Sequence, residues 1–273
     1  MHFGWLRSRV VGPEFLGAGM VSELRMQIEK MGRSQNIFCR AAYRGIKALG
    51  ALRRFLLSPR IRSQVLTRRL YAGQHFQGET FSCEDRYPEL FEECRERLAD
   101  RPGVRILSYG CATGEEVFTL ARYLPQAEIV GVDINRWCLK ECARRNTSAR
   151  IRFLHRMSPE FAGAAEFDAG FCMAVFQRTE HRIAGAEPVE TGFTFERFED
   201  EVRMLDEKLK PGGLLFLDEC DFSFEQTAVA AGYRPLEFAG NRVLRRRPLF
   251  GRDNRLIASE HDSVRGFVKL GQA

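Results

Sequence analysis

The sequence lacks the cysteine patterns that metal sites and disulfide frameworks require. Its eight cysteines are scattered, with no CxxC pair and no Cys/His cluster at metal-ligand spacing, so we expect reduced thiols and no bound metal. No run approaches the roughly 18 consecutive apolar residues of a membrane-spanning helix. The chain begins with Arg7, Arg9 and Glu14 where a signal peptide needs an apolar run, and we therefore expect a cytoplasmic protein.

Internal repeats and low-complexity segments are also absent, and 44% hydrophobic with 29% charged residues is a composition that supports a folded core. The 273 residues suffice for one α/β domain and a smaller second part. Positive charge is concentrated at the start, because residues 1–75 hold 14 Lys and Arg against 3 Asp and Glu. This segment favours an anionic partner such as nucleic acid, an anionic membrane surface or an acidic protein.

Apolar residues at three- and four-residue spacing predict amphipathic helices over 21–31 and 36–57, followed by a third over 60–71. Gly73 and Gly78 then flank a polar stretch typical of a linker. We therefore divide the chain into a basic helical segment (1–78), a larger domain (79–250) and a C-terminal tail (251–273). The basic helices are expected to form a cap over the site of the larger domain, with contact to an anionic partner as the alternative.

The larger domain alternates helix with strand. Helices are expected over 85–99, 114–124, 135–146 and 195–209, and strands over 104–109, 128–132, 150–154, 167–173 and 214–218. Two further strand-like runs, 233–238 and 242–247, are separated only by Ala239-Gly240-Asn241, which predicts an antiparallel hairpin. The predicted fold class is α/β: a Rossmann-like sheet of parallel strands closed by an antiparallel C-terminal hairpin, as in class I methyltransferases, with an N-terminal helical segment.

The turn after the first strand, ILSYGCATGEE at 106–116, is the strongest candidate for a binding site. A helix that begins directly after a parallel strand directs free amide groups and its positive dipole end toward a ligand at the strand edge. Ser108, Gly110, Ala112 and Gly114 stand at alternate positions, as do the acid and three glycines of a methyltransferase pattern. Gly110 and Gly114 match this pattern, whereas Ser108 replaces the acid and Ala112 replaces the middle glycine. The dinucleotide fingerprint GxGxxG is not present, so no pyrophosphate is implied.

Asp133 ends the second strand, 23 residues after Gly110. An acid at this place accepts hydrogen bonds from both hydroxyls of a ribose. The alternative is that Asp133 caps the helix that begins near Asn135 and that the glycines only form a tight turn. The turn, the acid and the antiparallel ending together favour S-adenosylmethionine as the cofactor.

GCATGEE is similar to the GxSTGEE segment of the chemotaxis receptor methyltransferase (CheR-like) family of S-adenosylmethionine enzymes. FDAGFCMAVFQR at 167–178 resembles the fourth-strand segment of that family, and RYPELF at 86–91 resembles the helix before its first strand. The resemblance covers roughly residues 75–220.

This resemblance implies that Glu115 or Glu116 reaches the methionine amino end of the cofactor and that Asp133 holds the ribose. It further implies that Met173 to Val175 line the methionyl side and that the loop His155 to Ser158 flanks the adenine. The expected cofactor-binding residues are Thr80, Tyr109, Gly110, Cys111, Ala112, Gly114, Glu115, Glu116, Asp133, Ile134, Met157, Ser158, Met173 and Ala174.

The sequence departs from the family in three places. The Asn of its C-R-N-V segment is Ala174 here, and only Thr80 and Arg86 offer counterparts to its N-x-T-x-F-F-R segment. The short connection at 239–241 leaves no room for the small β-subdomain by which chemotaxis enzymes dock on receptors, which argues against a chemoreceptor substrate.

Methyl transfer from a sulfonium needs mainly proximity and orientation, so a catalytic base is optional. Candidate bases are His155, His181, Asp218, Glu219 and Asp221, with His75 a weaker candidate, and the connection 176–194 offers Gln177, Arg178, Glu180 and His181 to a substrate.

The sequence thus predicts a methyltransferase that acts on a small molecule or a protein. The altered motif also allows a non-enzymatic cofactor-binding protein. The basic segment allows an RNA methyltransferase, although an Asn/Asp-Pro-Pro-Tyr-type motif is missing.

Overall fold

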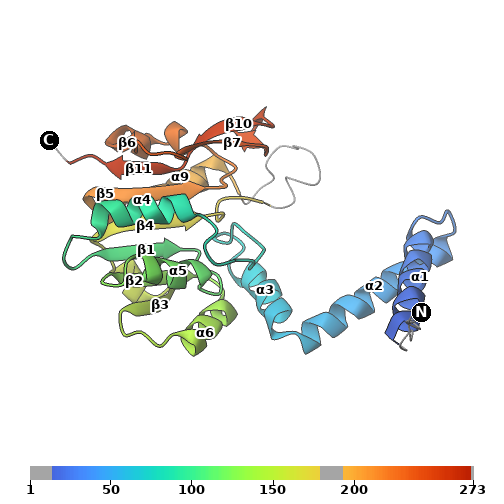
Figure 1. Cartoon of the computed structure of the whole chain (residues 1–273). Helices are drawn as coiled ribbons and strands as arrows, with labels where there is room; N and C mark the ends of the chain where they lie inside the picture. Colours follow the sequence, from blue (N-terminus) through green and yellow to red (C-terminus); the bar gives the residue numbers. More distant parts are fainter. Residues whose placement is uncertain (1–13, 179–192, 272–273) are drawn as a thin grey trace, which may run out of the picture. The chain divides into compact units, whose positions relative to one another are not determined.

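The computed structural model describes residues 14–178 and 193–271, and its contacts divide the chain into two compact units, Met1–Arg62 and Ser63–Ala273 (Figure 1). The division falls earlier than the predicted boundary at residue 78. Residues 63–78 belong with the larger unit because Ser63 Oγ donates a hydrogen bond to Asn135 Oδ1 at 2.6 Å and Phe76 is buried.

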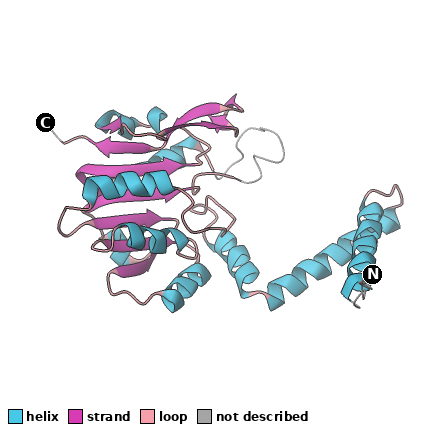
Figure 2. Cartoon of the chain, in the orientation of Figure 1, coloured by secondary structure: helices cyan, strands magenta, loops and turns pink. Residues whose placement is uncertain are grey.

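The helices expected near the N-terminus are confirmed as α1 (Glu14–Gly32), α2 (Ile37–Leu57) and α3 (Pro59–Leu70) (Figure 2). The side chain of Asn36 caps α2 by accepting a hydrogen bond from the amide of Phe38 at 2.8 Å. None of the helices in the described ranges is long and apolar enough to cross a membrane.

The alternating pattern predicted from 85 to 218 is confirmed, except that β5 begins at Leu209 instead of Leu214 and that the short helix α7 was not predicted. Its first part contains α4 (Pro88–Leu98), β1 (Arg105–Tyr109), α5 (Glu115–Tyr123), β2 (Glu128–Asp133), α6 (Arg136–Arg145), β3 (Ile151–His155), α7 (Pro159–Ala162), β4 (Phe167–Met173), α9 (Phe195–Lys208) and β5 (Leu209–Asp218). Its last part contains η1 (Phe224–Gln226), η2 (Ala228–Gly232), β6 (Tyr233–Pro235), β7 (Arg242–Arg245), β8 (Leu249–Phe250), β9 (Leu256–Ala258), β10 (His261–Val264) and β11 (Gly266–Lys269).

The main sheet has seven strands in the order β3-β2-β1-β4-β5-β11-β6. The pairs from β3 through β5 are parallel, whereas β11 is antiparallel to both β5 and β6. This arrangement confirms the predicted Rossmann-like α/β sheet, in which parallel strands are followed by an antiparallel closure. The order reverses between β1 and β4, which places the carboxyl ends of β1, β2 and β4 around one crevice, the usual position of a ligand site in such sheets.

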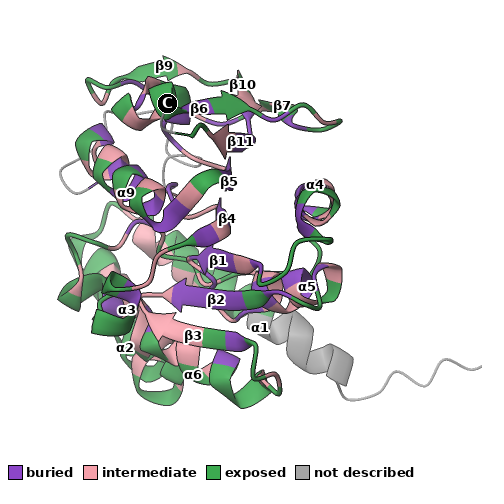
Figure 3. Cartoon of the chain, turned by 90° about the vertical axis from the view of Figure 1, so that its left-hand side faces the viewer, coloured by how far each residue is buried: buried purple, intermediate pink, exposed green. Residues whose placement is uncertain are grey.

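Helices cover both faces of the sheet, with α9 on one side and α4 and α5 on the other (Figure 3). The strands between them are largely buried, and the aromatic rings of Phe171 in β4 and Phe216 in β5 stack at a centroid distance of 4.5 Å with both side chains fully buried. This packing supplies the hydrophobic driving force that holds the strand ends in place.

The predicted hairpin between 233–238 and 242–247 is wrong. Strand β6 pairs with β11, whereas β7 pairs with β10 in a separate two-stranded sheet. Strand β6 ends at Pro235, so the connection to β7 spans 236–241 and not only the predicted 239–241, and it leads the chain out of the main sheet. The side chain of Asn241 in this connection holds the start of β11. The antiparallel closure of the main sheet therefore comes from the end of the chain.

The region predicted as a C-terminal tail (251–273) is also not a tail, because it contributes β9, β10 and β11. Residues 242–264 form two small strand pairs, β7 with β10 and β8 with β9, inserted between two strands of the main sheet. The connection at 239–241 therefore does not exclude a small β-subdomain, contrary to the expectation from the sequence.

Asn241 gives a test of this closure. Its buried side chain donates to the carbonyls of Leu236 (2.6 Å) and Gly266 (3.1 Å) and accepts from the amides of Arg265 (3.2 Å) and Gly266 (2.6 Å). Replacing Asn241 by Ala leaves these buried groups without partners, and we expect a loss of about 2–4 kcal/mol of unfolding free energy in urea denaturation.

The variant Arg246→Ala serves as the matched control, because Arg246 is exposed and forms its ion pair with the exposed Glu260. It should change the unfolding free energy by less than about 1 kcal/mol. Equal effects of the two substitutions would contradict the bridging role of Asn241.

Candidate functional site

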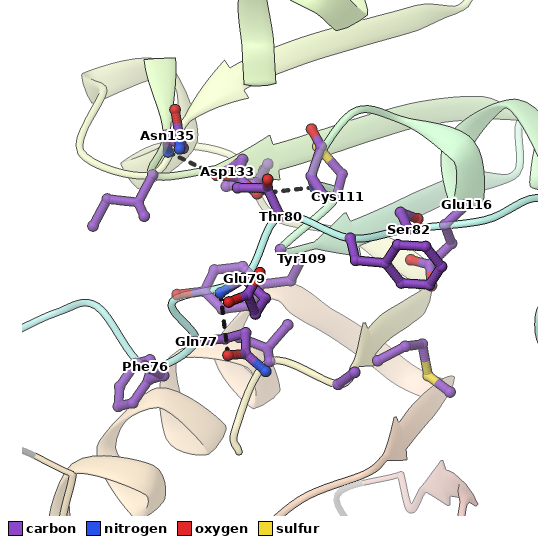
Figure 4. Close-up of a pocket in the computed structure, with 18 of the residues that line it drawn as sticks. Phe76, Gln77, Glu79, Thr80, Ser82, Tyr109, Cys111, Glu116, Asp133 and Asn135 are labelled. Carbon is purple, nitrogen blue, oxygen red and sulfur yellow. Dashed lines mark hydrogen bonds between the residues drawn. The ribbon is translucent and has the colours of Figure 1, made fainter. Parts of the chain in front are cut away.

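A cavity of about 260 Å³ lies at the carboxyl ends of β1, β2 and β4 (Figure 4). Its walls are the glycine turn after β1, the residues Val132 to Asn135 at the end of β2, and Met173 to Val175 at the end of β4. Residues from the segment 74–87 also line the cavity. The crevice expected from the strand order is therefore a real pocket with a covering segment of its own.

The glycine turn is tied to the neighbouring strand by its backbone. The amides of Gly110 and Cys111 both donate to the carbonyl of Val132, at 2.7 and 2.9 Å. Gly110 has a φ of +79°, and a Cβ there would lie 2.3 Å from Cγ2 of Val175. A side chain at this position is excluded by both conformation and space, because the side chain of Val175 occupies the place of a Cβ, and this explains the glycine.

Both carboxylate oxygens of Asp133 accept backbone hydrogen bonds, Oδ2 from Ala112 (2.9 Å) and Oδ1 from Asn135 (2.7 Å). Asp133 is not the cap of α6, since the side chain of Asn135 accepts from the first amides of that helix. Burial raises the pKa of Asp133 to about 6, even though the hydrogen bonds oppose the shift. Each oxygen keeps a lone pair that a ligand hydroxyl can use.

Glu116 occupies the opposite side of the pocket from Asp133 and Asn135 (Figure 4). The hydroxyl of Ser108 donates to its carboxylate at 2.6 Å. The acid that the methyltransferase pattern places at position 108 is thus replaced by a carboxylate from the first turn of α5, held by the serine in its place. Desolvation raises the pKa of Glu116 to about 7.

Glu115 is directed elsewhere. Its carboxylate pairs with Arg145 at 2.6 Å and accepts from Thr113 Oγ1 at 2.7 Å, and it does not contribute to the lining of the pocket. Of the two acids left open by the sequence, Glu116 is therefore the one at the pocket.

The segment before α4 adds Arg86 and Tyr87 to the same side of the pocket. The guanidinium of Arg86 pairs with Glu219 at 2.9 Å, which orients it. The hydroxyl of Tyr87 is buried and has no hydrogen-bond partner among the described residues. A buried donor that lacks a partner carries a free-energy cost.

A second buried group stands at the floor of the pocket. The hydroxyl of Tyr109 hydrogen-bonds to Glu201 of α9 and accepts from Arg156 Nε at 2.6 Å, while Arg156 also pairs with Glu201 at 3.0 Å. Arg156 lines the pocket and follows β3. This trio fixes the position of Tyr109 between the sheet and α9.

Ala174, at the end of β4, has a φ of +59°. Asparagine adopts this left-handed conformation more readily than alanine does, so Ala174 carries backbone strain at the pocket edge.

The pocket brings together most of the predicted cofactor residues. Those that line it are Thr80, Tyr109, Gly110, Cys111, Ala112, Glu116, Asp133, Ile134, Met173 and Ala174. Four do not line it: Gly114 begins α5, Glu115 pairs with Arg145, Met157 is 44% exposed, and Ser158 caps α7.

The segment 74–83 is the main contribution that the sequence did not reveal, because its polar composition and flanking glycines indicated only a linker. It lines the pocket with Gln74, His75, Phe76, Gln77, Glu79, Thr80, Phe81, Ser82 and Cys83. The buried ring of Phe76 packs edge-on against Phe176 and Phe193 and anchors the segment. An isolated aromatic residue in a polar stretch was the available signal.

Most of the candidate bases are occupied. His155 Nδ1 accepts from the amide of Met157 (3.2 Å), so its Nε2 donates to the carbonyl of Ile134 (3.0 Å). Asp218 pairs with Arg245 and Arg265, and Asp221 pairs with Arg247.

The candidate base Glu219 is paired with Arg86. The weaker candidate base His75 lines the pocket, and so does Gln177, one of the residues expected to meet a substrate. Glu180 and His181 lie outside the described residues, whereas the amide of Arg178 donates to Asp221. Across the described ranges, His, Cys, Asp and Glu side chains form no cluster of three that fits a metal ion.

Residues 106–186 match the model of a family described as a methyltransferase domain. The matched segment contains the glycine turn, Glu116, Asp133 and the end of β4. These residues therefore carry the sequence signature of a methyltransferase domain. A search of the curated proteins finds no match.

Three solved structures illustrate the structural similarity. The plantazolicin methyltransferase BpumL in complex with SAH is 15% identical, with a TM-score of 0.36, over 61% of this chain and 56% of that chain. YjhP from E. coli is 20% identical (TM-score 0.36; 67% and 74% covered). A SAM-dependent methyltransferase from Thiobacillus denitrificans in complex with S-adenosyl-L-homocysteine is 18% identical (TM-score 0.36; 68% and 74% covered). At this similarity none of the three identifies what this chain binds or acts on.

The raised pKa of Glu116 predicts a pH-dependent stability. The folded-state pKa of Glu116, about 7, exceeds its ordinary value of 4.5. Glu116 therefore contributes most to the free energy of unfolding below pH 4.5, and this contribution is lost as the pH rises through 7. The variant Glu116→Gln cannot ionise. Relative to the unmodified protein, it should therefore gain about 2–3 kcal/mol of unfolding free energy between pH 4.5 and pH 8.

Urea denaturation at the two pH values measures this difference. Glu115→Gln is the control, because the pKa of Glu115 is lowered by its partners and its contribution is lost at low pH instead. A pH-independent difference for Glu116→Gln would show that the carboxyl is not desolvated.

Proposed function

We propose that this chain binds S-adenosylmethionine in the pocket and transfers its methyl group to a small molecule or a protein side chain. The proposal rests mainly on two carboxylates at opposite sides of the pocket. They belong to Asp133, the last residue of β2, and to Glu116 in the first turn of α5. A ligand with ribose hydroxyls at one end and an ammonium group at the other matches this pair. The methyltransferase-domain match over the same residues supports it.

The residues present fit this cofactor. Asp133 would hold the ribose through the lone pairs that the backbone amides leave free, and Glu116 would hold the ammonium, which favours its ionised form. Arg86, which lines the pocket, would offer its guanidinium to the cofactor carboxylate.

The cofactor supplies an activated methyl group on a sulfonium with a good leaving group. The contribution of the chain is to bind and orient the reactants and to exclude water, and the segment 74–83 covers the pocket for that purpose. The occupied state of Asp218, Asp221 and His155 fits a reaction without a dedicated base.

The finer relationship to chemotaxis receptor methyltransferases stays a prediction. Two observations support it. Glu116, the last residue of the GCATGEE segment that is similar to the family's GxSTGEE, lines the pocket, and so do Met173 to Val175. The strand pairs between β6 and β11 give the chain a small β insertion, so a protein acceptor is as compatible with the fold as a small molecule. All eight cysteines are free, in keeping with the cytoplasmic location we propose.

Binding is tested by isothermal titration with S-adenosylmethionine. Replacing Asp133 by Asn removes the charged acceptors for the ribose hydroxyls and turns an amide donor toward a backbone N–H. We expect at least about a 30-fold loss of affinity, equivalent to about 2 kcal/mol. Absence of binding by the unmodified protein at millimolar ligand would overturn the proposal.

The matched control is Asp168→Asn. Asp168 also accepts from a backbone amide (Arg105, 2.9 Å) and pairs with a cation (Lys210, 2.8 Å), but it begins β4 at the far end from the pocket. Its substitution should leave the affinity unchanged.

Transfer is tested by incubating the protein with S-adenosylmethionine and a cell extract and measuring S-adenosylhomocysteine. We expect formation that depends on the extract and is lost in Asp133→Asn. Binding without any such formation would instead favour the non-enzymatic cofactor-binding protein.

A further inference from the structure

Helix α2 carries an apolar stripe on one face. At about 3.6 residues per turn, Phe38, Leu49, Leu52 and Leu56 align along the helix, with Ala42 and Gly45 completing the spacing. The four large side chains are 80%, 68%, 52% and 59% exposed, respectively, and none of the residues of α2 is buried. A row of this kind is an interaction surface rather than a set of scattered apolar residues.

The partner helix α1 packs elsewhere on α2. The hydroxyl of Tyr43 and the ammonium of Lys47 both bond to Glu29 of α1, at 3.1 and 2.7 Å. Gly32 of α1 approaches the ring of Tyr43 so closely that a Cβ there would lie 2.9 Å from it. Tyr43 and Lys47 lie on the side of α2 opposite the stripe, so the described contacts with α1 leave the stripe uncovered.

The charge of this region has one sign. Residues 30–78 contain 11 Lys and Arg and no Asp or Glu. On α2 itself, Arg40, Arg44, Lys47 and Arg54 share the side away from the stripe, and Arg53 lies beside it. An uninterrupted basic surface next to exposed leucines requires a partner that is both anionic and apolar.

We propose that α2 binds to the surface of an anionic membrane, with the stripe of Phe38, Leu49, Leu52 and Leu56 among the acyl chains and the basic side chains at the lipid phosphates. A basic amphipathic helix with a Leu- and Phe-rich face has the composition of an interfacial helix. RNA fits less well, because it would use the charge but leave the aliphatic stripe exposed, and Tyr43 is engaged with Glu29 rather than free to stack on a base.

The test is co-sedimentation of the full chain with vesicles of phosphatidylcholine alone or mixed with phosphatidylserine. We expect binding to the mixed vesicles only, weakening as salt rises. The double variant Leu49→Ser/Leu52→Ser should reduce binding more than about tenfold, because it removes two apolar anchors without changing the charge. Ala51→Ser is the matched control, since Ala51 is exposed on the side of Lys47.

Several outcomes would overturn the proposal. Failure to bind phosphatidylserine vesicles would do so, as would undiminished binding by the double variant. Displacement from vesicles by RNA at equal salt would assign the basic surface to nucleic acid. A dimer that the double variant converts to monomers would assign the stripe to a second copy of the chain. Circular dichroism should show the same helix content in all variants.

Discussion

The carboxylate of Asp133 joins the two chain segments on which the site depends. One of its oxygens holds the amide of Ala112 in the glycine turn, and the other holds the amide of Asn135 at the start of α6. Together with the bonds from Gly110 and Cys111 to Val132, these contacts fix the ends of β1 and β2 against each other. The pocket exists because the parallel strands end together and their connections are held apart there. The cost of burying this acid appears as its raised pKa.

The position of the second acid shows how a motif can be altered while its chemistry is kept. Ser108 stands where the methyltransferase pattern has an acid, and it holds the carboxylate of Glu116 by a hydrogen bond. The acid therefore stands eight residues later in the sequence, at position 116 instead of 108, and its side chain still lines the pocket. Because Glu116 sits at the beginning of α5, its ionised form also benefits from the positive end of the helix dipole.

The arginines near the end of β5 explain why several acids that the sequence offered as bases are not available. The buried Asp218 pairs with Arg245 of β7 and with Arg265, which directly precedes β11. The buried Asp221 pairs with Arg247, which follows β7. Removing one partner of a buried ion pair strongly lowers the free energy of unfolding, because the other charge stays buried without compensation. The acids therefore serve to attach the C-terminal strands to the sheet edge, a role that depends on partners far away in the chain.

The sequence by itself determined the helices and strands from α4 to β5, the glycine turn and the place of Asp133, because each depends on local periodicity or on the short distance between a strand and its helix. Only the tertiary structure decided that β11 closes the sheet, that Glu116 rather than Glu115 lines the pocket, and that residues 74–83 cover it. Strand pairing over about 30 residues and the direction of a side chain are set by packing against distant segments. The sequence of the connection between β6 and β7 is compatible with either a hairpin or an exit from the sheet.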